Sequence, residues 1–271
     1  MSSALSAAEE SGGPGGRDLR AVLSSLPRSL RPAVDGGPTD LREVSGDPGW
    51  RDRLVEAAAR GARGILVSDP TPEAPGDHVE DSVSIPVVVH SKWTCSETAR
   101  GAAPIFARLA ETGARLDVRI VEGFTRPTET IVLEQLQLAR ALGRPIDELE
   151  ILTSSQSSYT ALGRSTTGPV SFRMTRTRAE APSAGARIIA LHASAELRVP
   201  APENGRPGSV VVVDDDGERE LPLQFEDPRR TSWRRLHSAV VHGNPTDDLR
   251  ALEADLRTTR STLETVTARS S

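Results

Sequence analysis

Two short runs of aliphatic residues constrain the fold of this chain more than any other feature. Residues 64–67 read GILV and residues 85–89 read IPVVV, with no alternation of apolar and polar side chains. Strands that are apolar on both faces are typical of a parallel sheet covered by helices on both sides. Segments with helical spacing of apolar residues flank the runs at 48–60 and 97–111. The sequence therefore predicts an α/β domain built on a parallel sheet.

The second half of the chain has a different pattern. A helix is predicted over residues 130–142, followed by short β segments separated by turns. Closely spaced strands favour an antiparallel sheet with its helices on one face. The expected β segments are residues 116–121, 149–156, 169–177, 187–199, 209–216 and 218–223, and helices over 228–241 and 246–262 close the chain.

These patterns predict three parts. Residues 1–17, rich in Gly, Ser, Ala and Glu, are expected to form a disordered tail. Residues 18–114 are expected to form an incomplete, Rossmann-like parallel-sheet domain, and residues 115–271 an α+β domain with an open, mainly antiparallel sheet. The predicted fold class is therefore α/β with a second, α+β domain.

Composition argues against several classes of function. A formal net charge of -5 disfavours binding to nucleic acid or to anionic membrane surfaces. No apolar run is long enough to span a membrane, and the first residues lack a signal-peptide pattern. Cys95 is the single cysteine, so neither an internal disulfide nor a cysteine-based metal site is expected. A cytoplasmic protein that binds no metal is predicted.

Several stretches, taken in order, resemble the NAD(P)-dependent glucose–fructose oxidoreductase and inositol dehydrogenase family, Gfo/Idh/MocA. WRDRLVEAAARGARGILVSDPTP resembles the family's helix and its "aleaGkhVlvEKPla" strand, and IPVVVHSKWTCSETARGAAPIFARL its next strand, polar loop and helix. TIVLEQLQLARALG and ALEADLRTTRSTLE are similar to its second-domain helix and its final helix. The resemblance covers roughly residues 48–262 and implies a Rossmann domain followed by an open-faced sheet that commonly makes oligomer contacts.

The chain departs from the family pattern at the nucleotide-binding end. No GxGxxG-like loop follows an apolar strand before residue 48, and the GGPGG of residues 12–16 lies in the predicted tail. About half of the nucleotide-binding half is therefore expected to be missing. The family's Glu-Lys-Pro is replaced by Ser68-Asp69-Pro70, so Asp69 reverses the charge that the resemblance places near substrate and nicotinamide.

A second departure concerns the family's Asp and His, four residues apart on the second-domain helix. Counting back from Gly143, these positions fall on Glu129 and Leu133, or in another register on Glu134 and Leu138. Neither register contains a histidine. Because an aliphatic side chain cannot accept a hydroxyl proton during hydride transfer, the resemblance implies that this catalytic group is absent.

The best local candidate site follows the second aliphatic run. His90, Lys92 and Trp93 would lie at the carboxyl end of the parallel sheet, where α/β proteins bind ligands. Lys92, the only lysine, is a candidate for binding an anionic or hydroxylated ligand, and Trp93 for stacking on a sugar. The alternative is a solvated lysine beside a packing tryptophan. The candidate catalytic residues are Lys92, His90 and Glu129, and the candidate substrate-binding residues are Trp93, Asp69 and Tyr159.

Three hypotheses follow. The first is a degenerate family member, a pseudoenzyme without cofactor that binds a small molecule or a related catalytic subunit. The second is an active NAD(P)-dependent oxidoreductase for a sugar-like or other hydroxylated small molecule, in which Lys92 supplies the cation and His90 or Glu129 the acid/base. The third is a structural or regulatory module that forms homo-oligomers through its exposed sheet face.

Overall fold

Two compact units make up the chain. The structure, a computed structural model, describes residues 5–9, 30–32, 40–73, 79–222 and 226–270. The parallel-sheet unit comprises Met1–Ser91 and Asp227–Glu253, and the open-sheet unit comprises Lys92–Glu226 and Ala254–Ser271. The expected boundary at residues 114 and 115 differs from this division. Helix α4 (Glu97–Ala110) packs on strands of the open sheet, and α6 (Pro228–His242) returns to the parallel sheet.

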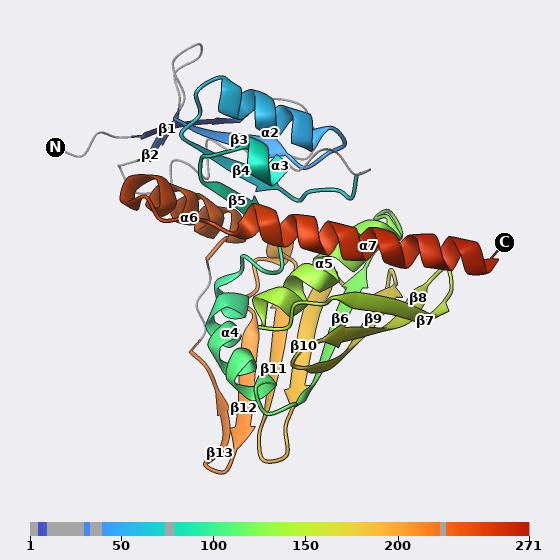
Figure 1. Ribbon diagram of the computed structural model, residues 1–271. Coiled ribbons are helices and arrows are strands. Elements are labelled where there is room, and N and C mark those ends of the chain that lie inside the picture. Colours follow the sequence, from blue (N-terminus) through green and yellow to red (C-terminus); the bar gives the residue numbers. More distant parts are fainter. Residues whose placement is uncertain (1–4, 10–29, 33–39, 74–78, 223–225, 271) are drawn as a thin grey trace. The chain divides into compact units, whose positions relative to one another are not determined.

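The parallel-sheet unit has five strands in the order β2-β1-β3-β4-β5, and all neighbours pair in parallel (Figure 1). The predicted fold class is confirmed: a parallel, Rossmann-like sheet is followed by a mainly antiparallel sheet. The strands of this unit are β1 (Leu5–Glu9), β2 (Leu30–Pro32), β3 (Leu41–Ser45), β4 (Gly64–Ser68) and β5 (Val87–His90).

Helices cover both faces of β4, which explains its unbroken aliphatic run. α2 (Trp50–Ala59) packs on β3 and β4, and α6 packs on β4 and β5. A Cβ atom at Gly64 would lie 2.6 Å from Val240 of α6. Glycine therefore lets α6 approach the sheet closely. A short helix, α3 (Val79–Ser82), precedes β5.

The N-terminal prediction requires correction. Leu5–Glu9, inside the expected disordered tail, forms β1 and pairs with both β2 and β3. A short strand therefore precedes the GGPGG segment, although residues 12–16 themselves lie outside the described residues. β1 was missed because the sequence LSAAE is short and only weakly apolar, whereas parallel pairing on both edges stabilises it through backbone hydrogen bonds.

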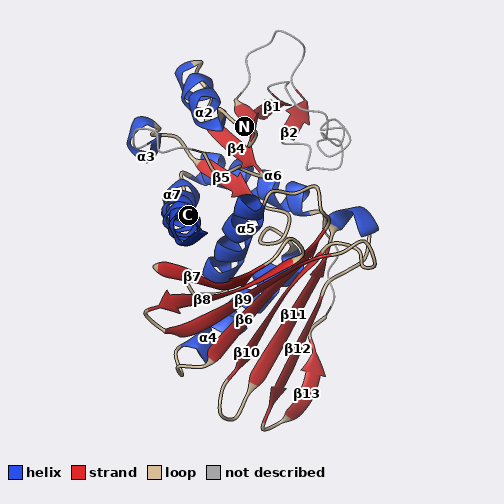
Figure 2. Ribbon diagram, turned by 90° about the vertical axis from the view of Figure 1, so that its right-hand side faces the viewer, coloured by secondary structure: helices blue, strands red, loops and turns tan. Residues whose placement is uncertain are grey.

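The open-sheet unit has eight strands in the order β13-β12-β11-β10-β6-β9-β8-β7 (Figure 2). β6 and β9 pair in parallel, and every other neighbouring pair is antiparallel. The strands are β6 (Arg115–Glu122), β7 (Glu148–Ser154), β8 (Ser158–Ser165), β9 (Gly168–Arg176), β10 (Ser183–Ile189), β11 (Ser194–Pro200), β12 (Ser209–Asp214) and β13 (Gly217–Glu220), and the 3-10 helix η1 (Pro202–Asn204) follows β11.

One face of the open sheet carries the hydrophobic core. α4 packs on β10, β11 and β12, and α5 (Thr128–Ala141) packs on β6 and β9. Ser96 caps α4 by accepting a hydrogen bond from the Ala99 N–H at 3.1 Å. The final helix, α7 (Asp248–Ser270), contributes residues to both units. The opposite face of the sheet presents polar and charged side chains at alternate strand positions.

The strands of this unit differ from the expected ones in two places. Residues 187–199, expected as one strand, form the β10–β11 hairpin, which turns at Ala190–Ala193 through an Ala190 N–H to Ala193 carbonyl hydrogen bond of 2.8 Å. His192 therefore lies in an exposed turn. Strand β8 was not predicted, because small or polar residues interrupt its apolar alternation: Gly163 and Ser165 take inward positions, whereas Leu162 points outward.

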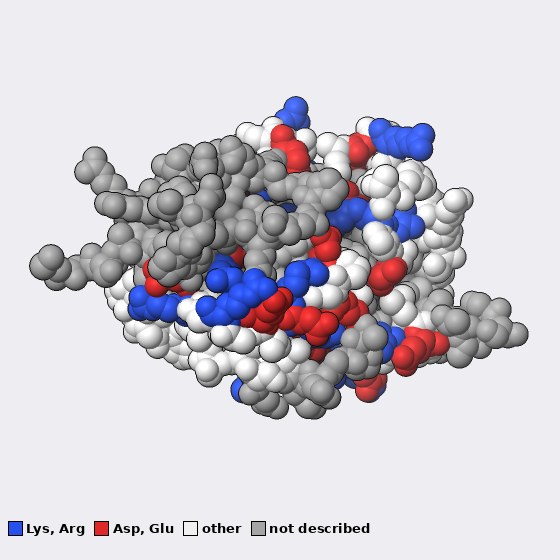
Figure 3. All heavy atoms as spheres, turned by 90° about the horizontal axis from the view of Figure 1, so that it is seen from above, with Lys and Arg blue, Asp and Glu red and all other residues white. Residues whose placement is uncertain are grey.

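On the face shown in Figure 3, acidic and basic side chains are intermixed, and neither sign of charge dominates. Among the described helices, none combines the length and the apolar character needed to cross a membrane.

Candidate functional site

A charged cluster in the open-sheet unit surrounds the only lysine of the chain. Lys92 Nζ lies 2.8 Å from Glu122 Oε2, with the two side chains 17% and 5% exposed. The same ammonium lies 4.4 Å from the ring centroid of Trp93, within the range of a cation–π interaction. One nearly buried carboxylate and one aromatic face therefore fix the position of the ammonium.

A second carboxylate extends this cluster. Trp93 Nε1 donates a hydrogen bond of 3.0 Å to Glu134 Oε2. Arg126 Nη1 lies 2.8 Å from Glu134 Oε1 and 3.4 Å from Glu122 Oε2, so it bridges the two glutamates. We call Lys92, Trp93, Glu122, Arg126 and Glu134 the Lys92 cluster. Its two cations and two carboxylates balance, and each glutamate contacts at least two other members.

The electrostatics of the cluster keep Glu122 ionised. Burial alone would raise the pKa of the Glu122 carboxyl, because a buried charge loses hydration. The hydrogen bond and positive charge of Lys92, the Gly123 N–H and the charge of Arg126 outweigh burial and hold the pKa below its usual value. The cluster is therefore an arrangement of fixed charges at neutral pH, which is the property that electrostatic catalysis requires.

Chain topology brings these residues together from three places. Lys92 and Trp93 follow β5 directly and precede α4, Glu122 ends β6, and Glu134 lies within α5. The sequence identified Lys92 and Trp93 as candidates but missed Glu122 and Arg126 as their partners. A Glu–Arg pair four residues apart after a strand was the only local signal for those two.

The parallel-sheet unit has a separate polar cluster beneath α6. Ser68 donates a hydrogen bond to Glu43 Oε1, and Arg229 Nη2 lies 2.7 Å from the same oxygen. Glu43 is only 2% exposed, so its charge is neutralised within the unit. The cluster connects the sheet to the first turn of α6.

His90 belongs to this second cluster. Its Nδ1 lies 3.0 Å from Ser232 Oγ, and that hydroxyl donates to the Pro228 carbonyl at 3.0 Å. Because the hydroxyl proton is directed to Pro228, Nδ1 is assigned as the donor to Ser232. The ring is 6% exposed. The predicted catalytic histidine therefore contacts α6 through Ser232 and helps to hold that helix against the sheet.

Asp69 occupies the turn after β4 and is exposed. It has a φ of 48° in the left-handed region, which Asp tolerates better than most residues. Its N–H donates a 3.0 Å hydrogen bond to the His90 carbonyl. Gly46 passes so close to this turn that a Cβ there would lie 2.4 Å from the Asp69 carbonyl oxygen. The backbone of the predicted strand-end turn is therefore tightly specified.

The two remaining candidates differ in their surroundings. Glu129 lies in the first turn of α5, where a negative charge favours the helix N-terminus. Tyr159 lies in the core and is 2% exposed, with its hydroxyl donating to Gln135 Oε1. Burial raises the pKa of the Tyr159 phenol, and the charge of Glu134 raises it further. The placement of Tyr159 differs from the ligand-facing position that we expected.

The strand order of the parallel-sheet unit contains a topological switch point at β1. From β1 the chain passes to β2 on one side, and β3 then lies on the other side of β1. In open α/β sheets, ligands bind beyond the carboxyl ends of the strands at such a switch point. Within the described residues, no group of three or more His, Cys, Asp or Glu side chains could hold a metal ion.

Comparisons with known proteins agree with this topology. No family model matches the sequence, and no curated protein matches it. GenD2 from gentamicin A biosynthesis, solved in complex with NAD, is 11% identical with a TM-score of 0.64, over 96% of this chain and 93% of that one. UDP-N-acetylglucosamine 3-dehydrogenase GnnA from Acidithiobacillus ferrooxidans is 14% identical with a TM-score of 0.60, over 86% and 81%.

A third solved structure is a variant of the 3-ketoreductase KijD10 from Actinomadura kijaniata, in complex with TDP-benzene and NADP. It is 11% identical with a TM-score of 0.61, over 83% of this chain and 77% of that one. The three similarities extend across both units of the chain. The protein therefore has the two-part fold of these oxidoreductases.

Proposed function

We propose that this protein is an NAD(P)-linked oxidoreductase of the Gfo/Idh/MocA type that acts on a sugar-like or otherwise hydroxylated small molecule. The observation that carries the proposal is the Lys92 cluster, in which the single lysine of the chain lies between a carboxylate and an indole ring. The fold shared with sugar-nucleotide dehydrogenases and ketoreductases supports the same class of reaction.

The strand order of the parallel-sheet unit, with its switch point at β1, is of the kind that binds nucleotides in open α/β sheets. β3 ends at Ser45, next to the switch point, and Gly46 and Asp47 follow it. Ser45 Oγ donates to Asp47 Oδ2 at 2.7 Å, so hydroxyl and carboxylate oxygens lie together there. These residues would contact the cofactor, and bound NAD(P) would supply the hydride acceptor or donor.

Lys92 is the residue that we assign to the chemical step. An ammonium close to the substrate oxygen stabilises the negative charge that develops as a hydroxyl loses its proton or a carbonyl gains hydride. Arginine supplies nearly all the other positive side-chain charge of this chain, but a guanidinium is a broad planar group, whereas an ammonium is a compact point charge. The pairing of Lys92 with Glu122 positions that point charge. Glu122, Arg126 and Glu134 act as positioning residues.

Lys92 supplies charge stabilisation and does not accept the substrate proton, so the candidate acid/base in place of the group that the sequence lacks is Glu129, in the first turn of α5. The helix position where the resemblance implies a histidine is Leu133 in one register and Leu138 in the other, and both side chains are buried. Glu134, the residue after Leu133, accepts a hydrogen bond from Trp93 Nε1. A charged group is therefore present on α5, but it acts on the tryptophan beside Lys92.

The test measures cofactor binding and turnover separately. Calorimetric titration with NADH and NADPH is expected to show binding in the range of about 1 μM to 1 mM. Turnover is then measured with NAD and NADP against a panel of free sugars, inositols and sugar nucleotides. Lys92→Ala is expected to abolish most of the turnover without changing cofactor affinity, and Arg164→Gln, an exposed position on β8, serves as the control.

Failure to bind either cofactor at millimolar concentration would overturn the proposal. The protein would then be a scaffold that binds a small molecule or a related subunit without redox activity. Cofactor binding accompanied by a fully active Lys92→Ala variant would keep the reaction class but remove the assignment of Lys92.

A further inference from the structure

Strand register places three arginines in one row across the open face of the eight-stranded sheet. Arg173 of β9 pairs with Arg119 of β6, and Arg119 pairs with Gly185 of β10. Gly185 in turn pairs with Arg198 of β11. Paired residues of neighbouring strands project from the same face, so Arg173, Arg119 and Arg198 form a line of like charges. We call these three residues the arginine row.

The arginine row is poorly neutralised by the protein itself. Arg119 has Glu180 at 3.9 Å, with both side chains more than half exposed, which is a weak ion pair. Arg198 contacts Glu196 on its own strand, and within the described residues the guanidinium of Arg173 has no ion-pair partner. Like charges directly opposite one another destabilise a sheet. Arg173 and Arg119 lie directly opposite each other, so their repulsion costs folding free energy that the exposed, weak Arg119–Glu180 pair offsets only in part.

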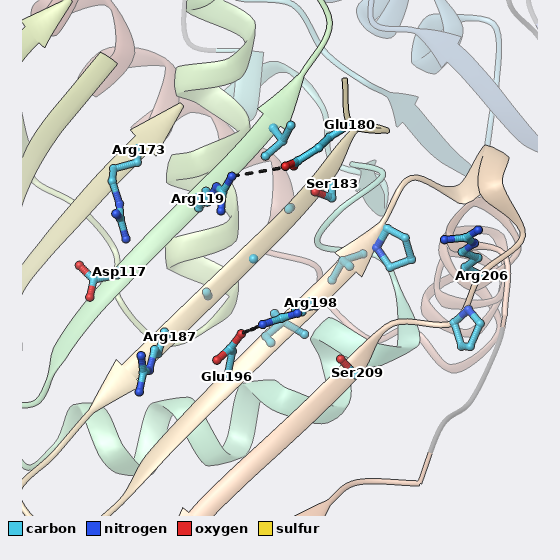
Figure 4. Close-up of a pocket in the computed structure, with 18 residues that line it drawn as sticks. Asp117, Arg119, Arg173, Glu180, Ser183, Arg187, Glu196, Arg198, Arg206 and Ser209 are labelled. Carbon is cyan, nitrogen blue, oxygen red and sulfur yellow. Dashed lines mark hydrogen bonds and ion pairs between the residues drawn. The ribbon is translucent and has the colours of Figure 1, made fainter. Parts of the chain in front are cut away.

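The row borders a groove of about 690 Å³ (Figure 4). Gly185 forms part of its floor because it places no side chain between Arg119 and Arg198. Arg187, in the next row of β10, and Arg206, after η1, add two guanidinium groups that have no ion-pair partner among the described residues. Five arginines and three carboxylates line the groove, an excess of two positive charges in a chain whose net charge is -5.

We propose that this groove binds a small molecule carrying two neighbouring phosphate groups. The groove has the volume of a typical small-molecule site, about 300 to 1,000 Å³. Guanidinium groups match phosphate oxygens in pairs, and neighbouring arginines can share one diphosphate. Binding would remove the like-charge repulsion within the row. The residues that line the groove all belong to the open-sheet unit, and none of them is a member of the Lys92 cluster.

The test uses inorganic pyrophosphate as the probe and calorimetry on the full chain. The wild-type protein is expected to bind it at low salt, with affinity that falls as salt concentration rises. Arg119→Gln and Arg173→Gln are each expected to weaken binding about tenfold or more. Arg164→Gln is the matched control, because Arg164 lies on β8 on the same face, outside the groove and paired with Glu148.

A stability measurement makes the test independent of variant folding. Without ligand, Arg119→Gln is expected to melt at or above the wild-type temperature, because the substitution relieves repulsion. Pyrophosphate is expected to raise the melting temperature of the wild type and of Lys92→Ala but to raise that of Arg119→Gln much less.

Equal pyrophosphate binding by all variants would place the anion elsewhere and overturn the proposal. No binding by the wild type at millimolar pyrophosphate would do the same. Salt-sensitive self-association that Arg119→Gln abolishes, without any pyrophosphate binding, would overturn it in favour of a second copy of the chain as the occupant.

Discussion

Lys92 Nζ and Glu122 Oε2 lie 2.8 Å apart, joining the segment after β5 to the end of β6. This pair supplies a fixed positive charge beside an indole ring and a carboxylate that stays ionised. It is the structural basis of the proposed reaction and of two predictions.

The first prediction concerns the kind of cation at position 92. Lys92→Arg keeps the charge but replaces the compact ammonium with a larger planar guanidinium that cannot take the same position, so kcat is expected to fall by about 10² or more with cofactor affinity unchanged. Steady-state kinetics and cofactor titration measure the two effects. Glu129→Gln tests the candidate acid/base at the start of α5. A large loss of kcat in Glu129→Gln with little loss in Lys92→Arg would remove the assignment of Lys92.

The second prediction concerns pH and Glu122. Because the pKa of Glu122 is lowered in the folded protein, its stabilising contribution is present above the ordinary glutamate pKa and disappears as pH falls through the folded-state value. Glu122→Gln is expected to lower the unfolding free energy by about 3 kcal/mol near neutral pH. Urea unfolding should show this difference shrinking as the pH falls below the ordinary glutamate pKa. Glu148→Gln is the exposed control, and a difference that does not depend on pH would contradict the prediction.

The third prediction uses Tyr159, the only tyrosine of the chain. Its pKa is raised in the folded state by burial, so the neutral phenol contributes stability below the ordinary tyrosine pKa, and that stability is lost as pH rises above it. Ultraviolet titration is expected to show no phenolate near about pH 10 while the protein stays folded. Phenolate absorbance should appear together with loss of the circular dichroism signal. Ionisation of a folded protein near the ordinary pKa would show that the phenol is accessible to solvent.

The fourth prediction concerns Gly46, which follows β3 and packs against the backbone of the turn after β4. Gly46→Ala would bring a Cβ within 2.4 Å of the backbone at Ser68, Asp69 and Pro70. Because backbone atoms cannot move aside cheaply, a loss of about 3 kcal/mol or more is expected. Gly101→Ala, in α4 with no atom within 4 Å of the added Cβ, is expected to stabilise by up to about 1 kcal/mol. Thermal unfolding distinguishes the two, and equal effects would show that the Gly46 contact relaxes.

The sequence predicted those elements whose side chains carry a strong periodic signal. The aliphatic runs at β4 and β5 and the helix at α5 followed from local pattern. β1 and β8 were missed because neither has a strong apolar pattern and both pair with strands on both edges. Pairing of this kind depends on strands distant in sequence, which periodicity cannot report.

The candidate site shows the same division. The sequence alone determined that Lys92 is the only lysine and that it follows a buried strand beside Trp93. Only the tertiary structure decided that Glu122, 30 residues later, pairs with it, and that His90 is bonded to Ser232 across 142 residues. Register likewise decided that Arg173, Arg119 and Arg198 form one row. Local sequence specifies which groups are available and which segments are apolar, whereas ion pairs and cross-strand rows depend on long-range packing that no short window of sequence encodes.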